Sequence, residues 1–212
     1  MIRIDPSHWT ADFRIARALA EAYSAAGLPD ALFVCVSDPD DDVAGFLGRM
    51  VADETRKYYP HVMGTSDAPV TRENFRERAA EALDRYGDAF IVGIEAGYGR
   101  APHLGSVEIT DRPLSTLAGI SEALTFGDVT VSAVLRLATG EAPAGPGAPA
   151  RRGAKGIAEA AREVGADDAL PGRKQFRPLL PEQINPAVVR RIADVIIDGN
   201  LRFLSKIGKQ EL

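Results

Sequence analysis

The sequence has little of the chemistry that identifies the best-known functional classes. Its 212 residues include one cysteine, three histidines and one tryptophan. A single thiol, Cys35, cannot form an internal disulfide, so nothing requires an oxidising compartment. Because Cys35 lies inside an apolar run, we expect it to be a small buried residue. The histidines fit no zinc-ligand spacing, and neither a Walker-type phosphate loop nor a dinucleotide-binding fingerprint is present.

Long hydrophobic runs and an excess of positive charge are also missing. No stretch approaches the roughly 18 apolar residues of a membrane span, and the N-terminus lacks the apolar core of a signal peptide. Lys and Arg number 25 against 30 Asp and Glu, a net charge of −5. We therefore expect a soluble, cytoplasmic protein with neither a membrane nor a nucleic acid as its partner.

What is present indicates an α/β fold. Apolar residues make up 45% of the chain. The continuous apolar runs 31–36 and 89–94 are typical of strands buried on both faces. Apolar residues at helical spacing predict helices over 10–26, 43–58, 72–86 and 187–207. A further helix around 114–125 and a strand over 128–138 are also expected. Helices that alternate with buried strands favour a two-layer or three-layer domain, with a mixed sheet of about four or five strands.

Two local details of this fold can be predicted as well. A helix over 72–86 would have Thr71 as its N-cap. The strands 89–95 and 105–111 are separated by a short glycine-rich stretch, which is too short for a parallel crossover. We therefore expect these strands to pair antiparallel, with the glycines in a hairpin loop.

The composition changes after residue 138. Residues 139–153 are dense in Gly, Pro and Ala, a composition typical of a flexible loop or linker. The sequence thus predicts an α/β domain over 1–138, a linker over 139–153 and a helical arm over 154–212. The arm would pack on its own domain or on a partner, and a second copy of the chain is the expected partner.

Carboxylates follow two of the predicted buried strands. Asp38 and Asp40 come directly after the strand 31–36, and Glu95 ends the strand 89–94. Ligands of open α/β sheets bind beyond the carboxyl ends of the strands, and carboxylate oxygens suit Mg²⁺. Asp38 and Asp40 are candidate metal ligands, and Glu95 is a candidate catalytic group. The same aspartates are also typical of a turn that opens a helix.

The segment from Thr71 to Gly97 resembles the inosine/xanthosine triphosphate pyrophosphatases. The resemblance consists of the helix that begins Thr71-Arg72-Glu73-Asn74 and a strand that ends Gly93-Ile94-Glu95-Ala96-Gly97. It implies that Glu95 assists Mg²⁺ in hydrolysing a nucleoside triphosphate. The phosphate-gripping motif of that family is absent, because four aspartates and no lysine follow the strand 31–36.

Two functional hypotheses remain at this point. In the first, the protein is a Mg²⁺-dependent hydrolase of a phosphate ester or nucleotide anhydride. Arg72 and Arg76 would steady phosphate oxygens, and the backbone at Gly97 would approach the substrate closely. In the second, the protein is a non-catalytic subunit of a homo-oligomeric assembly, joined through its C-terminal arm.

Overall fold

The computed structural model describes residues 1–38, 45–112, 114, 126–138 and 179–208. Six strands form a single sheet in the order β1-β5-β6-β4-β2-β3. Only β5 runs against its neighbours, because β6, β4, β2 and β3 pair parallel and β1 pairs antiparallel to β5. The strands are β1 (Ile2–Ile4), β2 (Asp30–Cys35), β3 (Val62–Met63), β4 (Ala89–Gly99), β5 (Val107–Thr110) and β6 (Val129–Leu137).

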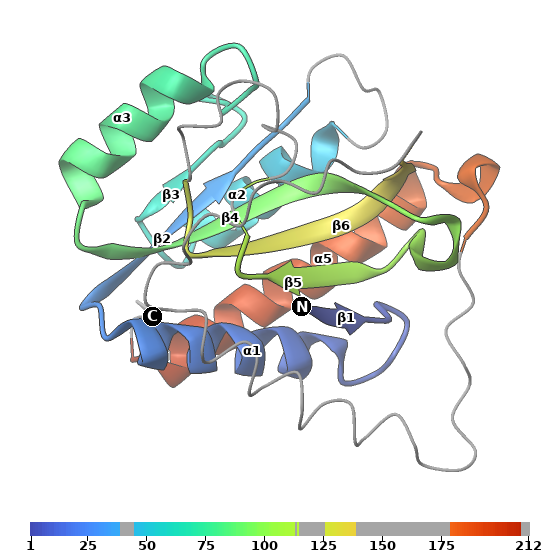
Figure 1. The fold of residues 1–212 in the computed structure, drawn as a ribbon, viewed down its shortest axis with the longest axis horizontal. Coiled ribbons are helices and arrows are strands. Elements are labelled where there is room, and N and C mark those ends of the chain that lie inside the picture. Colours follow the sequence, from blue (N-terminus) through green and yellow to red (C-terminus); the bar gives the residue numbers. More distant parts are fainter. Residues whose placement is uncertain (39–44, 113, 115–125, 139–178, 209–212) are drawn as a thin grey trace.

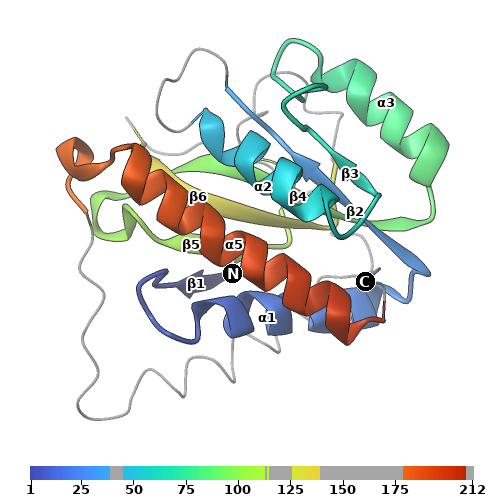
Figure 2. The same ribbon diagram turned by 180° about the vertical axis from the view of Figure 1, so that it is seen from behind.

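Four α-helices of the described residues cover the two faces of this sheet, so the α/β fold with a mixed sheet is confirmed in a three-layer form. They are α1 (Ala11–Ala26), α2 (Phe46–Arg56), α3 (Phe75–Tyr86) and α5 (Pro186–Lys206). Two 3₁₀ turns, η1 (Ala101–His103) and η3 (Pro181–Gln183), complete the described elements. Figure 1 shows α3 on one side of the sheet, and Figure 2 shows α5 crossing the other side with α1 and α2 beside it.

The helix-rich face carries the larger apolar core. Alternate residues of β2 and β4, among them Phe33, Phe90 and Ile94, pack with α1, α2 and α5 in one cluster. Helices α1 and α5 approach closely at Gly199, where a Cβ atom would lie 2.6 Å from Ile15 Cγ2. Burial on this scale removes the apolar stripe of α5 from solvent, and this burial is the main stabilising contribution to such a core.

The other face has a smaller apolar cluster under α3. Leu32, Val34 and Ile91 pack there with Phe75 and the remaining members of the cluster. Further along the same face the side chains become polar, with Glu95 on β4 and Ser132 on β6. The sheet is therefore apolar on both sides at β2 and on one side only toward β6.

Helix boundaries follow local capping chemistry. Gly27 ends α1 with a φ of 65°, a left-handed conformation that favours glycine. Asn185 caps α5, since its Oδ1 accepts from the backbone N–H groups of Ala187 at 3.0 Å and Val188 at 3.2 Å. Pro186 stands at the first helical position, where no N–H is needed.

Two sequence predictions about this region are wrong. Strands β4 and β5 do not pair, because β6 lies between them and pairs with both. Gly97 and Gly99 lie within β4 and pair with β6, so they form no hairpin loop. The prediction failed because β6 comes later in the chain, and a loop length cannot reveal a strand inserted between two others.

The start of α3 also differs from the prediction. The helix begins at Phe75 with Asn74 as its N-cap, whereas Thr71 was expected in that place. Asn74 Oδ1 accepts from the Thr71 backbone N–H at 2.8 Å, and Asn74 Nδ2 donates to the Pro69 carbonyl at 2.9 Å. These bonds hold residues 69–74 in a non-helical turn, so Arg72 precedes the helix.

Other predicted segments lie outside the described residues. They are the linker 139–153, the part of the arm before residue 179, and most of the helix expected near 114–125. In the described part of the chain, no helix is both long and apolar enough to span a bilayer.

Candidate functional site

The connections of the sheet reverse direction between β2 and β4. From β2 the chain passes through α2 to β3, the outer strand on one side of β2. It then returns through α3 to β4, on the other side of β2. Helices α2 and α3 lie on opposite faces of the sheet. Such a reversal leaves a crevice beyond the carboxyl ends of the two strands, which is the usual ligand site of an open α/β sheet.

Glu95 lies at this reversal on the α3 side of β4. Its side chain is completely buried, and the Ser132 hydroxyl of the neighbouring β6 donates to its Oε1 at 3.0 Å. Gly93 and Gly97, which have no side chains, flank Glu95 on the same face of the strand. The sequence Gly-x-Glu-x-Gly therefore lies within strand β4 and forms no turn. On this face of the strand, Glu95 is the one side chain between two glycines.

Asp38 follows β2 and reaches across β4 to β6. Arg136 Nη2 lies 2.9 Å from Asp38 Oδ2, and the Arg136 side chain is 13% exposed against 43% for Asp38. The β2–β4 pairing of Cys35 with Ile94, continued by the same number of residues, places Asp38 level with Gly97. A Cβ atom at Gly97 would lie 3.0 Å from Ser132 Cβ, so the glycine allows β6 to approach closely beside Glu95.

An exposed aromatic ring borders the ion pair. Tyr98, at the register shift of β4 against β6, is 55% exposed, and the Arg136 guanidinium lies 5.4 Å from its ring centre. A guanidinium stacked on a ring keeps its N–H edge directed at an anion. In this structure that anion is the carboxylate of Asp38.

Ser37 adds a hydroxyl at the same edge. It is 4% exposed, and its Oγ has no hydrogen-bond partner among the residues that the structure describes. Its backbone N–H donates to the Val70 carbonyl at 2.8 Å, which brings the loop before α3 to the carboxyl end of β2. Helix α2 is also close, since a Cβ atom at Gly48 would lie 3.0 Å from Ser37 Oγ. Buried hydroxyl groups almost always have a hydrogen-bond partner, so Ser37 Oγ is a further polar group at this edge that a ligand could contact.

The structure brings some of the predicted site residues together and leaves others apart. Glu95 and Gly97 share one face of β4, and Asp38 follows the neighbouring parallel strand β2 at the same edge of the sheet. Arg72 is exposed in the turn after Val70, which forms a bridge with Val36 at that edge. Arg76 is exposed on α3, and Asp40 lies outside the described residues. Within the described ranges, no group of three or more His, Cys, Asp or Glu side chains is arranged to hold a metal ion.

Sequence reasoning missed four residues of this edge: Ser37, Tyr98, Ser132 and Arg136. Arg136 and Ser132 lie on the predicted strand 128–138. Their place beside β4 depends on the strand order, which the sequence did not fix. Cys35, by contrast, is buried as expected, and burial raises the pKa of its thiol far above its ordinary value.

The comparisons with known proteins concern most of the described sheet. Residues 6–141 match a family described as a protein of unknown function, DUF1256. The chain belongs to the DUF1256 family. The match ends just after β6, so α5 lies outside the matched residues. The resemblance to inosine/xanthosine triphosphate pyrophosphatases is wrong, because the helix and Gly-x-Glu-x-Gly segment on which it rested lie inside the DUF1256 match.

One curated relative is similar over part of the chain. The uncharacterized protein YyaC of Bacillus subtilis (strain 168) is 27% identical over 117 residues, which cover 53% of this chain and 56% of YyaC. The chain thus spans about half the length of this relative. No solved structure matches significantly.

Proposed function

We propose that this DUF1256 protein is a hydrolase whose site lies at the carboxyl ends of β2 and β4. One observation carries the proposal: β2 and β4 are parallel neighbours at the reversal of the chain path, and a carboxylate belongs to the carboxyl end of each, Asp38 after β2 and Glu95 on β4. The two carboxylates come from different strands and differ in environment, since Glu95 is completely buried while Asp38 is 43% exposed. Two carboxyl groups in different environments can divide acid and base roles between them.

A phosphate ester or anhydride is the substrate class that this edge favours. The guanidinium of Arg136 already binds a carboxylate, and the same donor geometry binds phosphate oxygens. Arg72 adds a second, exposed guanidinium near the edge. Substrate phosphate would thus replace Asp38 as the partner of Arg136.

A divalent cation would then be held by Asp38, with Glu95 beneath it. Mg²⁺ commonly uses only one or two protein carboxylates and fills its remaining positions with water and substrate oxygens. Two carboxylates are therefore a sufficient protein contribution. The cation would supply charge stabilisation of the phosphoryl group and a more acidic water, and Glu95 would accept the proton of that water.

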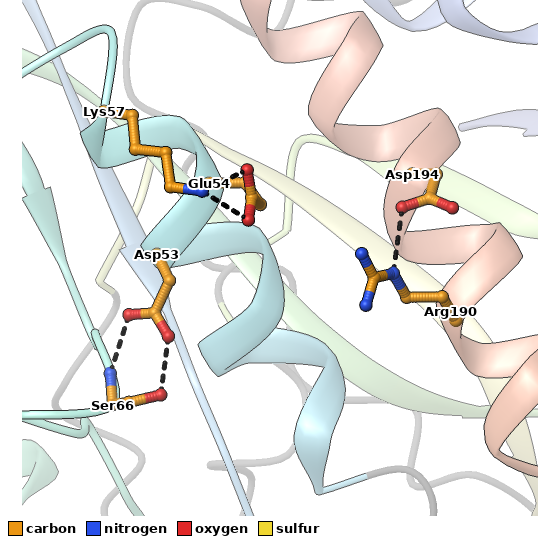
Figure 3. A network of polar contacts seen from close by, with 6 residues as sticks. All are labelled: Asp53, Glu54, Lys57, Ser66, Arg190 and Asp194. Atoms are coloured by element: carbon orange, nitrogen blue, oxygen red, sulfur yellow. Dashed lines mark hydrogen bonds and ion pairs between the residues drawn. The ribbon is translucent and has the colours of Figure 1, made fainter.

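The test compares carboxylate variants in an assay of p-nitrophenyl phosphate and ATP hydrolysis, with and without millimolar Mg²⁺. We expect Mg²⁺-dependent turnover that falls roughly 10²- to 10⁴-fold in Asp38→Asn and in Glu95→Gln, the range for loss of an acid or base group. Asp194→Asn is the matched control, because Asp194 also pairs with an arginine, Arg190, at 3.3 Å on the outer side of α5 (Figure 3). Undiminished turnover in both site variants, with folding intact by circular dichroism, would sink the proposal.

A further inference from the structure

A hollow lies between the outer strand β3 and helix α3, away from the carboxyl end of β4. Its volume is about 520 Å³, within the roughly 300–1,000 Å³ of small-molecule sites. Strand β3 and the loop after it form one wall, α3 forms the other, and Arg56 of α2 and Asp30 of β2 close it. Figure 1 shows α3 lying alongside β3 at this end of the sheet.

The outer edge of β3 cannot pair with an added peptide strand at Val62, because both backbone groups of this residue already have partners. The outward carbonyl of Val62 accepts from Arg56 Nη1 at 3.1 Å, and the Val62 N–H donates to the Pro60 carbonyl at 3.0 Å. Strand addition needs these backbone groups to be available. A ligand in the hollow is therefore recognised by side chains.

Those side chains favour an anion. Three guanidinium groups line the hollow, from Arg56, Arg78 and Arg85, against the carboxylates of Asp30 and Glu81. Arg78 Nη1 is paired with Glu81 Oε2 at 2.8 Å, and an arginine in such a pair has further N–H groups with which to bind an anion. This local excess of positive charge stands out in a chain whose net charge is −5. Asp30 is engaged further inside, since it accepts from the Tyr59 hydroxyl at 2.6 Å and lies 3.1 Å from His61 Nδ1. Its charge is thus directed partly away from the hollow.

The aromatic residues of the hollow argue against a nucleotide base. The ring of Tyr86 already contacts the Arg85 guanidinium at 5.3 Å and the His61 ring at 5.1 Å between centres. Polar groups of Glu81 and Thr65 also line the hollow, and its other lining residues are apolar or small, namely Pro60, Val62, Met63, Gly64 and Ala68. Carboxylates beside arginines suit a ligand that combines phosphate with several hydroxyl groups.

The wall is also held in place, as a site requires. Ser66 in the loop after β3 donates its backbone N–H to Asp53 Oδ1 at 2.9 Å and its hydroxyl to Asp53 Oδ2 at 2.6 Å (Figure 3). These bonds tie the loop that carries Thr65 and Ala68 to α2. Preorganised walls lower the ordering cost of binding.

We propose that the hollow between β3 and α3, lined by Arg56, Arg78 and Arg85, binds a phosphorylated polyol or sugar. The phosphate lies against the guanidinium groups, and the hydroxyls donate to Glu81. This site is separate from the proposed hydrolase site and does not depend on it.

The test is isothermal titration of the full chain with sorbitol 6-phosphate, compared with sorbitol, inorganic phosphate and adenosine monophosphate. Sorbitol 6-phosphate should bind most tightly and sorbitol should not bind. Arg78→Gln and Arg85→Gln should each weaken binding about tenfold or more, the effect of losing one charged hydrogen bond. Arg191→Gln, an exposed arginine of α5 on the opposite face, should leave binding unchanged.

Several results would overturn the assignment. Binding that survives the double variant Arg78→Gln/Arg85→Gln, or that is abolished by Asp38→Asn, places the ligand elsewhere. Adenosine monophosphate or inorganic phosphate binding as tightly as sorbitol 6-phosphate refutes the polyol class. Unchanged melting temperatures of the unliganded variants show that a loss of binding is not a loss of folding. Arg85→Gln serves this purpose best, because Arg85 forms no ion pair within the described residues, whereas Arg78 is paired with Glu81.

Discussion

The two faces of the sheet differ in what their side chains do. Toward α1, α2 and α5, each of the long parallel strands presents a continuous apolar row, such as Phe90, Val92 and Ile94 of β4. Toward α3, the same strand presents the apolar Ile91 and then the carboxylate of Glu95. Two glycines, Gly93 and Gly97, flank Glu95 on this face. One strand thus supplies core on one side and a functional edge on the other.

The difference teaches where this fold can tolerate polar chemistry. The helix-rich face stabilises the domain, because its large side chains are almost all buried and interlocked. The apolar cluster on the face toward α3 is centred on β2 and the start of β4, and polar side chains such as Glu95 and Ser132 follow it toward β6. Substitutions at neighbouring positions of one strand should therefore have effects of different kind and size.

The largest effect is expected for Ile94 and Glu95, consecutive residues of β4 that point to opposite faces. Ile94→Ala should lower the free energy of unfolding by about 2–5 kcal/mol, because it leaves a cavity in the interlocked face. Glu95→Gln keeps the size of the side chain and an oxygen that can accept from Ser132. It should therefore change the free energy of unfolding by about 1 kcal/mol or less. Urea unfolding followed by circular dichroism measures both. Equal losses in the two variants would mean that both faces stabilise the domain alike.

A second comparison uses pH. Burial raises the pKa of Cys35, so the folded thiol stays protonated while the unfolded thiol ionises near its ordinary value of 9.0. A raised pKa contributes stability below pH 9 that is lost as the pH rises above it. Between pH 8 and pH 10 the wild type should lose about 1.4 kcal/mol more than Cys35→Ala, one pKa unit of linkage.

This measurement is insensitive to other groups, because the remaining tyrosines and lysines titrate in both proteins. The substitution itself costs stability at every pH, and only the change with pH is compared. An identical decline in the two proteins would show that the thiol is accessible in the folded state, and the helix-rich face would then be more open than the structure describes.

Much of the fold could be predicted from sequence because the apolar periodicity is strong. The run 31–36, the helix near 10–26 and the helix near 187–207 all exist within a residue of the expected bounds, and the strand of the run 89–94 begins at the expected residue. Strand β3 was not expected, because two residues give no period to recognise. The six strands also exceed the expected four or five, and β4 is longer because glycines read as a loop are paired in the sheet.

The candidate site was less predictable because it depends on strand order. Asp38 and Glu95 could be placed at strand ends from sequence, and β2 and β4 are indeed parallel neighbours. Arg136 and Ser132 could not be assigned, since their strand joins β4 only after a long excursion through β5. The hollow beside β3 gave no signal at all, because its arginines come from helices separated in sequence and the strand is too short to detect.

The smallest expected effects on stability come from removing one hydroxyl group from each side of the sheet. Thr55 is fully buried on α2, and its Oγ1 has no hydrogen-bond partner in the described part of the chain, whereas Ser132 Oγ donates to Glu95. Thr55→Val keeps the shape of the side chain and removes an unsatisfied polar atom, so it should stabilise the protein by about 1 kcal/mol, or roughly 2–4 °C in melting temperature.

Ser132→Ala removes the hydroxyl that donates to the buried carboxylate of Glu95, and should destabilise the protein by about 1 kcal/mol. Helix propensity does not confuse the first change, because Thr and Val differ little. Opposite signs in the two melts would establish that polar groups are tolerated on one face and supported on the other, and destabilisation by Thr55→Val would mean that its hydroxyl has a partner in solution.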